Sequence, residues 1–199
     1  TIRMEAFHLN TDSVYRKVYC YNNVRAYRTD VQAVCDLLIF NSKDSCMTMY
    51  RDPIVWTGNR QLLGDSIKAY MNDSTVREAY VLGNALGIEL MFDGKHYNQI
   101  SSKEMRAYFT DGKLRRNEAI GNVLSLYYIM EEKDSSLLYL NYMECDTMRM
   151  YISAERKTEK IWGASPNAMM YPLTQVPPGK DRLSGFAWYD YVRPKDKHD

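Results

Sequence analysis

The sequence predicts an all-β protein in which repeated antiparallel hairpins build two sheets that fold over against each other. Three observations predict this class: apolar and polar residues alternate with a period of two, a short hairpin motif recurs, and a glycine follows each copy at nearly the same offset. A period of two places alternate side chains on opposite faces of a strand, whereas a helix has a period of 3.6. Repeated units that cannot bury their apolar faces alone are expected to stack on one another.

The composition is that of an ordinary globular chain. Of the 199 residues, 45% are hydrophobic and 26% are charged, and 26 basic residues balance 25 acidic ones to a net charge of +1. A nucleic-acid-binding protein normally carries a basic face, so no nucleic-acid partner is expected. No apolar run approaches the roughly 18 residues of a membrane helix. Because the chain begins at Thr1 and not at Met, we expect a processed or excised piece, in which a missing signal peptide says nothing about the compartment.

The hairpin motif begins with an acid and ends with a tyrosine. Its three copies occupy 65–70, 104–108 and 146–151, and their tyrosines lie 38 and 43 residues apart. A Gly-Asn pair follows the tyrosine by 13 residues in the first two copies, and a glycine follows by 12 in the third. These glycines are Gly83, Gly121 and Gly163.

A turn is expected between each tyrosine and its glycine, at 72–74, 111–112 and 154–156. Asp111-Gly112 is a strong hairpin signal, because a tight turn needs positive φ at both central residues. Each copy therefore predicts a strand, a tight turn and a second strand. The Gly-Asn pair then permits a bend, and a further strand is expected at 84–92 and at 122–130.

The N-terminal third carries a more degenerate version of the same pattern. Asn22-Asn23 stands where the other copies have Gly-Asn, and an acid-led strand is expected at 36–40, with a shorter one at 12–14. Gly58-Asn59 supplies a further predicted bend before the strand that Asp65 opens.

The C-terminal end breaks the pattern. A repeat domain is therefore expected over 1–175, followed by a C-terminal extension over 176–199 that has a possible last strand at 183–189 and a frayed tail from 193 onward. Helical periodicity is poor nearly everywhere, and the best helix candidate, at 131–137, is short.

No constellation of catalytic or metal-binding residues is evident. His8, His96 and His198 are far apart in sequence, and no nucleophile elbow or phosphate-binding loop is present. The acids Asp65, Glu104 and Asp146 could suggest a glycosidase pair, but they recur at the same point of each repeat, as a structural role would require. We expect a non-enzymatic protein without cofactor or metal. The 17 tyrosines leave carbohydrate binding as an alternative, although tyrosine also favours strands and lines up across neighbouring ones.

The four cysteines, at 20, 35, 46 and 145, match no metal-binding or redox spacing. Three of them lie in alternating, strand-like sequence, where a buried free thiol is the commoner outcome. One or two disulfides in an oxidising compartment remain the alternative.

The apolar phase of the three hairpin motifs defines a candidate binding face. Twelve methionines are many for this length, and their flexible side chains suit a surface that accommodates flexible apolar partners. The same residues could equally be ordinary core, and a register slip by one residue would place all of them on the other face. The candidate lining is Ile67, Ala69, Met71, Met105, Ala107, Phe109, Met148, Met150 and Ile152.

The order and spacing of these units resemble the LptA/OstA-like family. Gly-Asn or Asn-Asn pairs at 22–23, 58–59, 83–84 and 121–122 alternate with strands led by Asp36, Asp65, Glu104 and Asp146. The stretches 52–56 and 63–65, and the closing 185–188 with 193–195, are also similar to segments of that family. Two positions depart from it: Asn22 replaces a glycine, and the third repeat ends in Gly-Ala-Ser-Pro.

The resemblance implies a jelly-roll-like or β-taco domain with an apolar seam. It further implies non-catalytic binding and transfer of lipopolysaccharide or a related acylated lipid across the periplasm in outer-membrane biogenesis. Partners would be that lipid and, through open sheet edges, further copies or other transport-bridge proteins. The alternative is a structural β-repeat scaffold segment of a larger cell-envelope protein.

Overall fold

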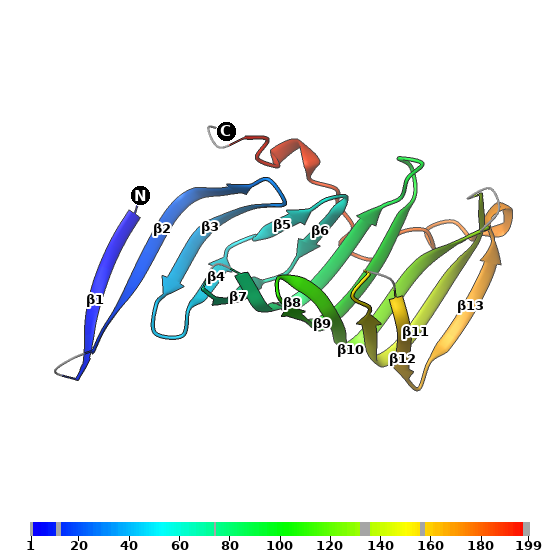
Figure 1. Ribbon diagram of the computed structural model, residues 1–199. Coiled ribbons are helices and arrows are strands. Elements are labelled where there is room, and N and C mark those ends of the chain that lie inside the picture. The colour runs from blue at the N-terminus through cyan, green and yellow to red at the C-terminus, as the bar shows by residue number, and fades with distance from the viewer. Residues whose placement is uncertain (1, 11–12, 74, 132–135, 156–157, 197–199) are drawn as a thin grey trace.

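The computed structural model describes residues 2–10, 13–73, 75–131, 136–155 and 158–196, with the backbone alone for 2–10 and 13 (Figure 1). Within this part of the chain it consists of thirteen strands in one sheet and two single 3-10 turns. The prediction of an all-β, antiparallel fold is confirmed. The elements are β1 (Ile2–Asn10), β2 (Ser13–Arg28), β3 (Val31–Asn41), β4 (Cys46–Tyr50), β5 (Ile54–Thr57), β6 (Arg60–Leu63), β7 (Ser66–Asn72), β8 (Thr75–Leu90), β9 (Tyr97–Thr110), β10 (Lys113–Met130), β11 (Leu137–Ile152), β12 (Thr158–Ala164), β13 (Asn167–Pro172), η1 (Leu173–Gln175) and η2 (Asp190–Val192).

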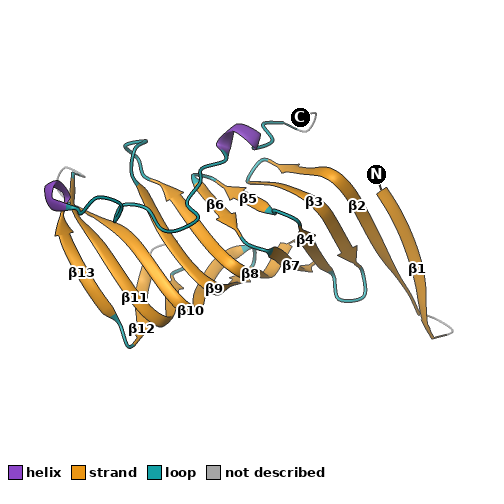
Figure 2. Ribbon diagram, turned by 180° about the vertical axis from the view of Figure 1, so that it is seen from behind, coloured by secondary structure: helices purple, strands orange, loops and turns teal. Residues whose placement is uncertain are grey.

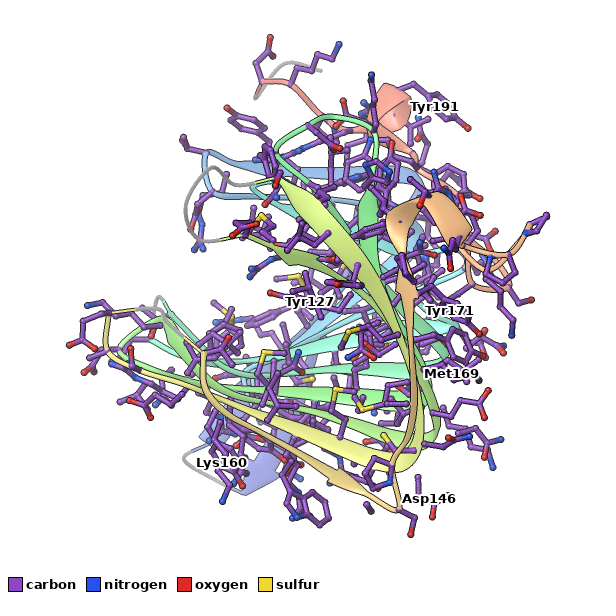
Figure 3. The ribbon with its side chains drawn as sticks, turned by 90° about the vertical axis from the view of Figure 1, so that its right-hand side faces the viewer. Tyr127, Asp146, Lys160, Met169, Tyr171 and Tyr191 are labelled. Atoms are coloured by element: carbon purple, nitrogen blue, oxygen red, sulfur yellow. The ribbon has the colours of Figure 1, made fainter. Side chains whose placement is uncertain are left out.

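The sheet folds over along a line through the middle of its long strands. One end of β3 pairs with β4 and the other with β5, and β8 pairs in the same way with β7 and β6. At the C-terminal side, β12 and β13 pair with the two ends of β11. We call the layer with β1, β4, β7 and β12 the lower half and the layer with β5, β6 and β13 the upper half; β2, β3, β8, β9, β10 and β11 run through both. The predicted folded-over architecture is confirmed, but its two layers belong to one continuous sheet and not to two (Figure 3).

The fold line is built from pairs of residues with positive φ. The φ angles are 64° and 51° at Asn22-Asn23, 71° and 45° at Gly83-Asn84, and 81° and 51° at Gly121-Asn122. The strand pairing skips at each of these points, as in a β-bulge, which bends a strand. Glycine and asparagine are the residues that tolerate this left-handed conformation best. The three predicted bends are therefore confirmed.

Acidic side chains secure two of these corners. Asp36 accepts a 3.0 Å hydrogen bond from the backbone N–H of Asn23, on the neighbouring strand. Asp65 accepts two from the side-chain amide of Asn84, at 3.0 and 3.2 Å, and donates its own N–H to the carbonyl of Gly83 at 2.9 Å. The interpretation of the strand-leading acids as structural is confirmed at Asp65.

The predicted bend at Gly58-Asn59 is a tight turn, and the glycine of the third repeat, Gly163, forms no bend. Gly58-Asn59 is the two-residue turn of the β5–β6 hairpin, because Thr57 pairs directly with Arg60. Gly163 lies within β12 and has no positive φ, and the last corner is formed instead around Ser165, whose φ is 49°. A glycine or a Gly-Asn pair alone does not distinguish a bend from a tight turn, since both use the same left-handed conformation.

The expected turn at 111–112 falls where predicted. Asp111 and Gly112, with φ of 50° and 69°, form the tight β9–β10 turn. The turns at 72–74 and 154–156, and the short strand at 12–14, each include a residue outside the described ranges. The helix candidate at 131–137 also lies partly outside them, but the flanking Glu131 donates its N–H to the carbonyl of Ser136 at 2.8 Å, as in a hairpin. Among the described residues, no helix is long and apolar enough to cross a membrane.

The segment that follows η1 crosses the outer face of the upper half, as seen from behind in Figure 2. We call residues 176–196 the strap. The predicted strand at 183–189 is wrong, because this stretch has no regular hydrogen bonding to a neighbouring strand. The prediction of a frayed tail from 193 is also wrong for the described part: Pro194 is buried, and Arg193 donates hydrogen bonds to Gln32 at 2.8 and 2.6 Å. His198 lies outside the described residues.

Apolar side chains gather in two clusters. The first lies inside the fold, along the fold line, and contains residues of both halves, such as Ile67, Met105 and Val123. The second lies on the outer face of the upper half, where Leu126 and Leu140 pack beneath Leu183 of the strap. The sheet is therefore covered on both faces in its upper half and on the inner face alone in its lower half.

Candidate functional site on the inner face of the folded sheet

The row of lining residues closest to the fold line is fully buried. Strand register places Met49, Ile67, Val81, Met105, Ala119 and Met148 side by side across six strands of the lower half. All six belong to the first apolar cluster. The structure therefore brings together three of the predicted lining residues, Ile67, Met105 and Met148, as tightly packed core.

The next row outward is partly exposed. It contains Met47, Ala69, Ala79, Ala107, Asn117, Met150 and Ile161, again in register across the lower half. Ala69, Ala107 and Met150 are half-buried, and Ile161 on the edge strand is 55% exposed. The predicted phase is confirmed for these residues, although Asn117 interrupts the apolar row.

The third row lies at the free ends of the strands. Met71 pairs with Val76, and Phe109 pairs with Leu114, each beside a register shift that keeps the apolar side chains on the inner face. Both pairs and Ile152 are partly exposed. All nine predicted lining residues thus share the inner face, and their exposure rises from the fold line to the opening.

The upper half supplies the opposite wall, which the sequence analysis missed. Its inner row near the fold line contains Ala33, Val55, Leu62, Gly87, Ile100, Ser125 and Met143. Period-two alternation is the signal that would predict this wall, but β5 and β6 are four residues long and give too few positions to show it.

A more polar row follows toward the opening of the upper half. Register aligns Arg60, Glu89, Asn98, Tyr127, Asn141 and Met170. Arg60 and Glu89 form an ion pair at 2.9 Å, and Asn98 donates a hydrogen bond to Glu89 at 3.2 Å. Tyr127 lies on the side that faces the lower half, whereas Tyr171 lies on the outer side (Figure 3). The inner face is therefore apolar near the fold line and carries hydrogen-bonding groups farther out.

Three buried glutamines on the outer face hold the strap against the upper half. Gln61 donates to the carbonyl of Ala187 at 2.8 Å and accepts from the N–H of Tyr189 at 2.8 Å. Gln99 repeats this arrangement with Asp181 and Leu183, at 2.9 and 2.8 Å. A primary amide offers one donor and one acceptor side, so each glutamine imitates a neighbouring strand for the strap backbone. Gln32 completes the row through Arg193.

Burial and hydrogen bonds account for the shifted pKa values in this half of the molecule and at its thiols. Burial raises the pKa of the Cys35 thiol to about 11 and also raises that of Cys145. Burial opposes ionisation of Asp93, but hydrogen bonds from His96 and from nearby backbone N–H groups lower its pKa to about 2. All four cysteines are free, and Cys35, Cys46 and Cys145 are buried. Among the described residues, no group of three or more His, Cys, Asp or Glu side chains could hold a metal ion.

Comparisons with known proteins add little. No protein-family model matches the sequence, and no curated protein matches it. Among solved structures, the fold is similar to that of LptH from Pseudomonas aeruginosa, described as the LptA homologous periplasmic component of the conserved lipopolysaccharide transport device. The identity is 12% and the TM-score 0.49, over 71% of this chain and 93% of that chain. A likeness this limited decides neither the family nor the function of this chain.

Proposed function

We propose that this chain binds the acyl chains of a lipid between the inner faces of its two halves and passes the lipid on without covalent chemistry. The lipid is lipopolysaccharide or a related acylated lipid of the cell envelope, and the compartment is the periplasm, as the sequence resemblance implies. One observation carries the proposal: the inner rows near the fold line are mostly apolar across the sheet, and the buried first row is followed by partly exposed ones.

The energetics suit this role. Burial of an acyl chain stabilises a complex by about 0.8 kcal/mol per CH₂ group, so even one chain offers considerable affinity. Met71 and Met150 are partly exposed on the inner face, and their flexible thioethers adapt to chains of different shape. Polar groups farther out, such as Arg60 and Asn98, lie where the head group of a bound lipid would leave the apolar zone.

Transfer needs a path along the sheet, and apolar residues of the inner rows reach its C-terminal edge. Ile161 on β12 and Met170 on β13 are 55% and 57% exposed on the inner side of the C-terminal edge. The far end of the sheet is β1, which pairs with β2 and with no other strand of the described residues. Unpaired edges accept further strands, so a second copy or a related partner would extend the rows into a longer path.

The second candidate function is a structural scaffold segment of an envelope protein. It is favoured by the complete burial of the row with Ile67, Met105 and Met148, which needs no ligand to be stable. If the protein is a scaffold, the partly exposed inner rows should bind no lipid.

Native mass spectrometry of the purified protein with lipopolysaccharide and with short-chain lipids tests the proposal. We expect retained lipid in the wild type. Ile161→Asp, which places a charge on the inner face, should weaken retention roughly tenfold. The matched control is Trp162→Asp, the adjacent residue, which is 41% exposed on the outer face. Loss of all lipid from a wild type with an intact β-sheet circular dichroism spectrum would refute the proposal and favour the scaffold.

A further inference from the structure

Two adjacent strands, β10 and β11, interrupt the apolar inner rows with hydrogen-bonding side chains. In the upper half, Ser125 lies in the row nearest the fold line, and Tyr127 and Asn141 lie in the next row. In the lower half, Asn117 lies in the second row from the fold line. We call Asn117, Ser125, Tyr127 and Asn141 the polar set.

Strand geometry places the polar set on both walls of the inner face. Ser125 and Tyr127 are two residues apart on β10, so both point to the same side of the sheet. Asn141 is the direct neighbour of Tyr127 on β11, and the Cβ atoms of side chains paired in this way lie about 5 Å apart. Tyr127 lies on the side that faces the lower half, to which Asn117 belongs (Figure 3). A ligand between the halves therefore meets hydrogen-bonding groups on both walls.

The polar set is accessible and has no hydrogen-bond partner in the described part of the chain. Tyr127 is 51% exposed, and the side chains of Asn117, Ser125 and Asn141 are partly exposed. Among the described residues, none donates a hydrogen bond to these four side chains or accepts one from them. Their hydrogen-bonding capacity is therefore available to a ligand.

The same upper row is satisfied internally on the preceding strands. Arg60 on β6 forms an ion pair with Glu89 on β8 at 2.9 Å. Asn98 on β9 donates a hydrogen bond to Glu89 at 3.2 Å and accepts one from the backbone N–H of Tyr128 at 2.9 Å. Between β9 and β10 the row thus changes from groups that bind one another to groups that can bind a ligand.

The chemistry of the polar set favours a neutral acceptor. It consists of two primary amides and two hydroxyls, which are uncharged and can all donate hydrogen bonds. A phosphate or carboxylate is bound best by arginine or lysine, whereas neutral donors suit an acceptor such as a carbonyl oxygen. The neighbours of the polar set in strand register are uncharged as well: Ile100, Ala107, Met143, Met150 and Met170.

These groups determine which part of a lipid can lie over them. A hydrocarbon chain that covered an amide or a hydroxyl would remove its hydrogen bonds to water and replace none, at a cost larger than the gain from burying one CH₂ group. A carbonyl oxygen in the same place replaces the lost hydrogen bond. The methylene groups that follow the carbonyl would lie against Met143 and Met150, which flank the polar set in register.

We infer that the polar set binds the carbonyl oxygens through which acyl chains are linked, as esters or amides, to the rest of the lipid. The linkages then lie at β10 and β11, and the chains extend along the apolar rows. The inference rests on the proposed lipid-binding function and names the feature of the lipid that is recognised, which is the acyl linkage and not a charged head group.

Native mass spectrometry with a matched pair of lipids tests the inference. The pair is a short-chain diester phosphatidylcholine and the diether phosphatidylcholine of the same chain length, which lacks the carbonyl oxygens. The wild type should retain the diester roughly fivefold better, as expected for one or two hydrogen bonds. Tyr127→Phe combined with Asn141→Leu removes two donors and keeps the apolar surface, so this double variant should lose most of the preference and retain the diether at least as well as the wild type.

Tyr151→Phe is the matched control, because it removes a hydroxyl from the outer face of β11, and it should keep the wild-type preference. Tyr127→Phe alone, which keeps the ring, decides the question if the double variant lacks a β-sheet circular dichroism spectrum, and it should lower the preference in part.

The outcomes separate this inference from the proposed function. Equal retention of the two lipids by the wild type, or an unchanged preference in the double variant, would overturn the inference and leave the proposed function in place. Retention of lipopolysaccharide but of neither phosphatidylcholine would also overturn it, because recognition would then depend on the head group. Retention of no lipid at all by the wild type would overturn both.

Discussion

The upper and lower halves are made largely from the same strands, yet their outer faces are stabilised differently. In the upper half, Leu126, Tyr128 and Leu140 form an apolar outer surface, and the strap buries it. In the lower half, the outer face of the same strands is open and carries alternating cations and aromatic rings. The difference shows that one strand can belong to a two-layered structure over half of its length and to a single layer over the other half.

The open outer face is held by pairs between neighbouring strands. Arg116 lies over the ring of Tyr108 at 4.1 Å, and Arg149 lies over Trp162 at 5.0 Å. Cation–π pairs of this kind contribute about 0.5–1 kcal/mol each at exposed sites. A hydrogen bond to Glu78 raises the pKa of Tyr80 to about 12, so this tyrosine stays neutral. Tyr108 and Tyr151 flank Arg116, so tyrosines here alternate with charged residues across the strands and do not pair directly with one another, contrary to the prediction.

If the strap stabilises the upper half, replacing one of the buried glutamines that hold it should cause the largest loss in the free energy of unfolding. Gln61→Met keeps the length of the side chain but leaves the Ala187 carbonyl and the N–H groups of Tyr189 and Trp56 without this partner. Because Gln61 is fully buried, we expect a loss of about 3 kcal/mol in the free energy of unfolding. Urea denaturation measures it, with Gln175→Met, exposed in η1, as the control. Equal midpoints for the two variants would show that the strap contributes nothing to stability.

Replacing the glycines of the fold line by alanine should lower the free energy of unfolding by different amounts at different positions. An alanine at either Gly83 or Gly121 must adopt positive φ, which costs about 1 kcal/mol. At Gly83 the new methyl group also meets the carboxylate of Asp65, whereas at Gly121 it meets the flexible side chain of Lys103. We expect Gly83→Ala to lose about 2–3 kcal/mol and Gly121→Ala about 1 kcal/mol. Gly58→Ala is the control, because its new methyl group contacts nothing and its loss in unfolding free energy reports the positive φ alone. An equal loss in all three variants would show that contact with Asp65 does not contribute to the stability of the corner.

The smallest loss in the free energy of unfolding is expected for a substitution on the open outer face of the lower half. Glu118 is the least exposed carboxylate there and lies 3.1 Å from Arg149 and 3.6 Å from Arg116. Because both arginines are well exposed, solvent weakens these ion pairs. Glu118→Gln should therefore lower the unfolding free energy by about 1 kcal/mol in thermal or urea denaturation, and Glu159→Gln on the exposed edge strand by less. A loss as large as that of Gln61→Met would contradict the contrast between the two halves.

The lower half was the more predictable from sequence, and the reason is physical. Its strands are long and have one wet and one dry face, so Met105, Ala107 and Phe109 stand out against Arg106 and Tyr108. The corners at 22–23, 83–84 and 121–122 were also predictable, because few residues accept positive φ.

The strap was not predictable, because its residues follow no period and pair with glutamines far away in sequence. Gln61 and Gln99 share the outer face of their strands with Leu63 and Tyr97, which pack in the second apolar cluster, but β6 is too short for an apolar phase to be recognised in the sequence. The short strands β5 and β6 were not predicted, because four residues are too few to show an alternating pattern. The two layers form a single sheet because the long strands stay paired on both sides of the corner. Alternation of apolar and polar residues does not specify this pairing.

The bonds of the strap also constrain the order in which the protein assembles. Gln61 reaches Ala187 across 126 residues of sequence, and Gln32 reaches Arg193 across 161. Contacts between such distant parts of a chain form slowly, because a long loop must close first. During synthesis, the hairpins can pair one after another as they leave the ribosome, but Gln32, Gln61 and Gln99 lack their strap partners until residues 181–193 have been made. The upper half is thereby completed well after its own strands have formed.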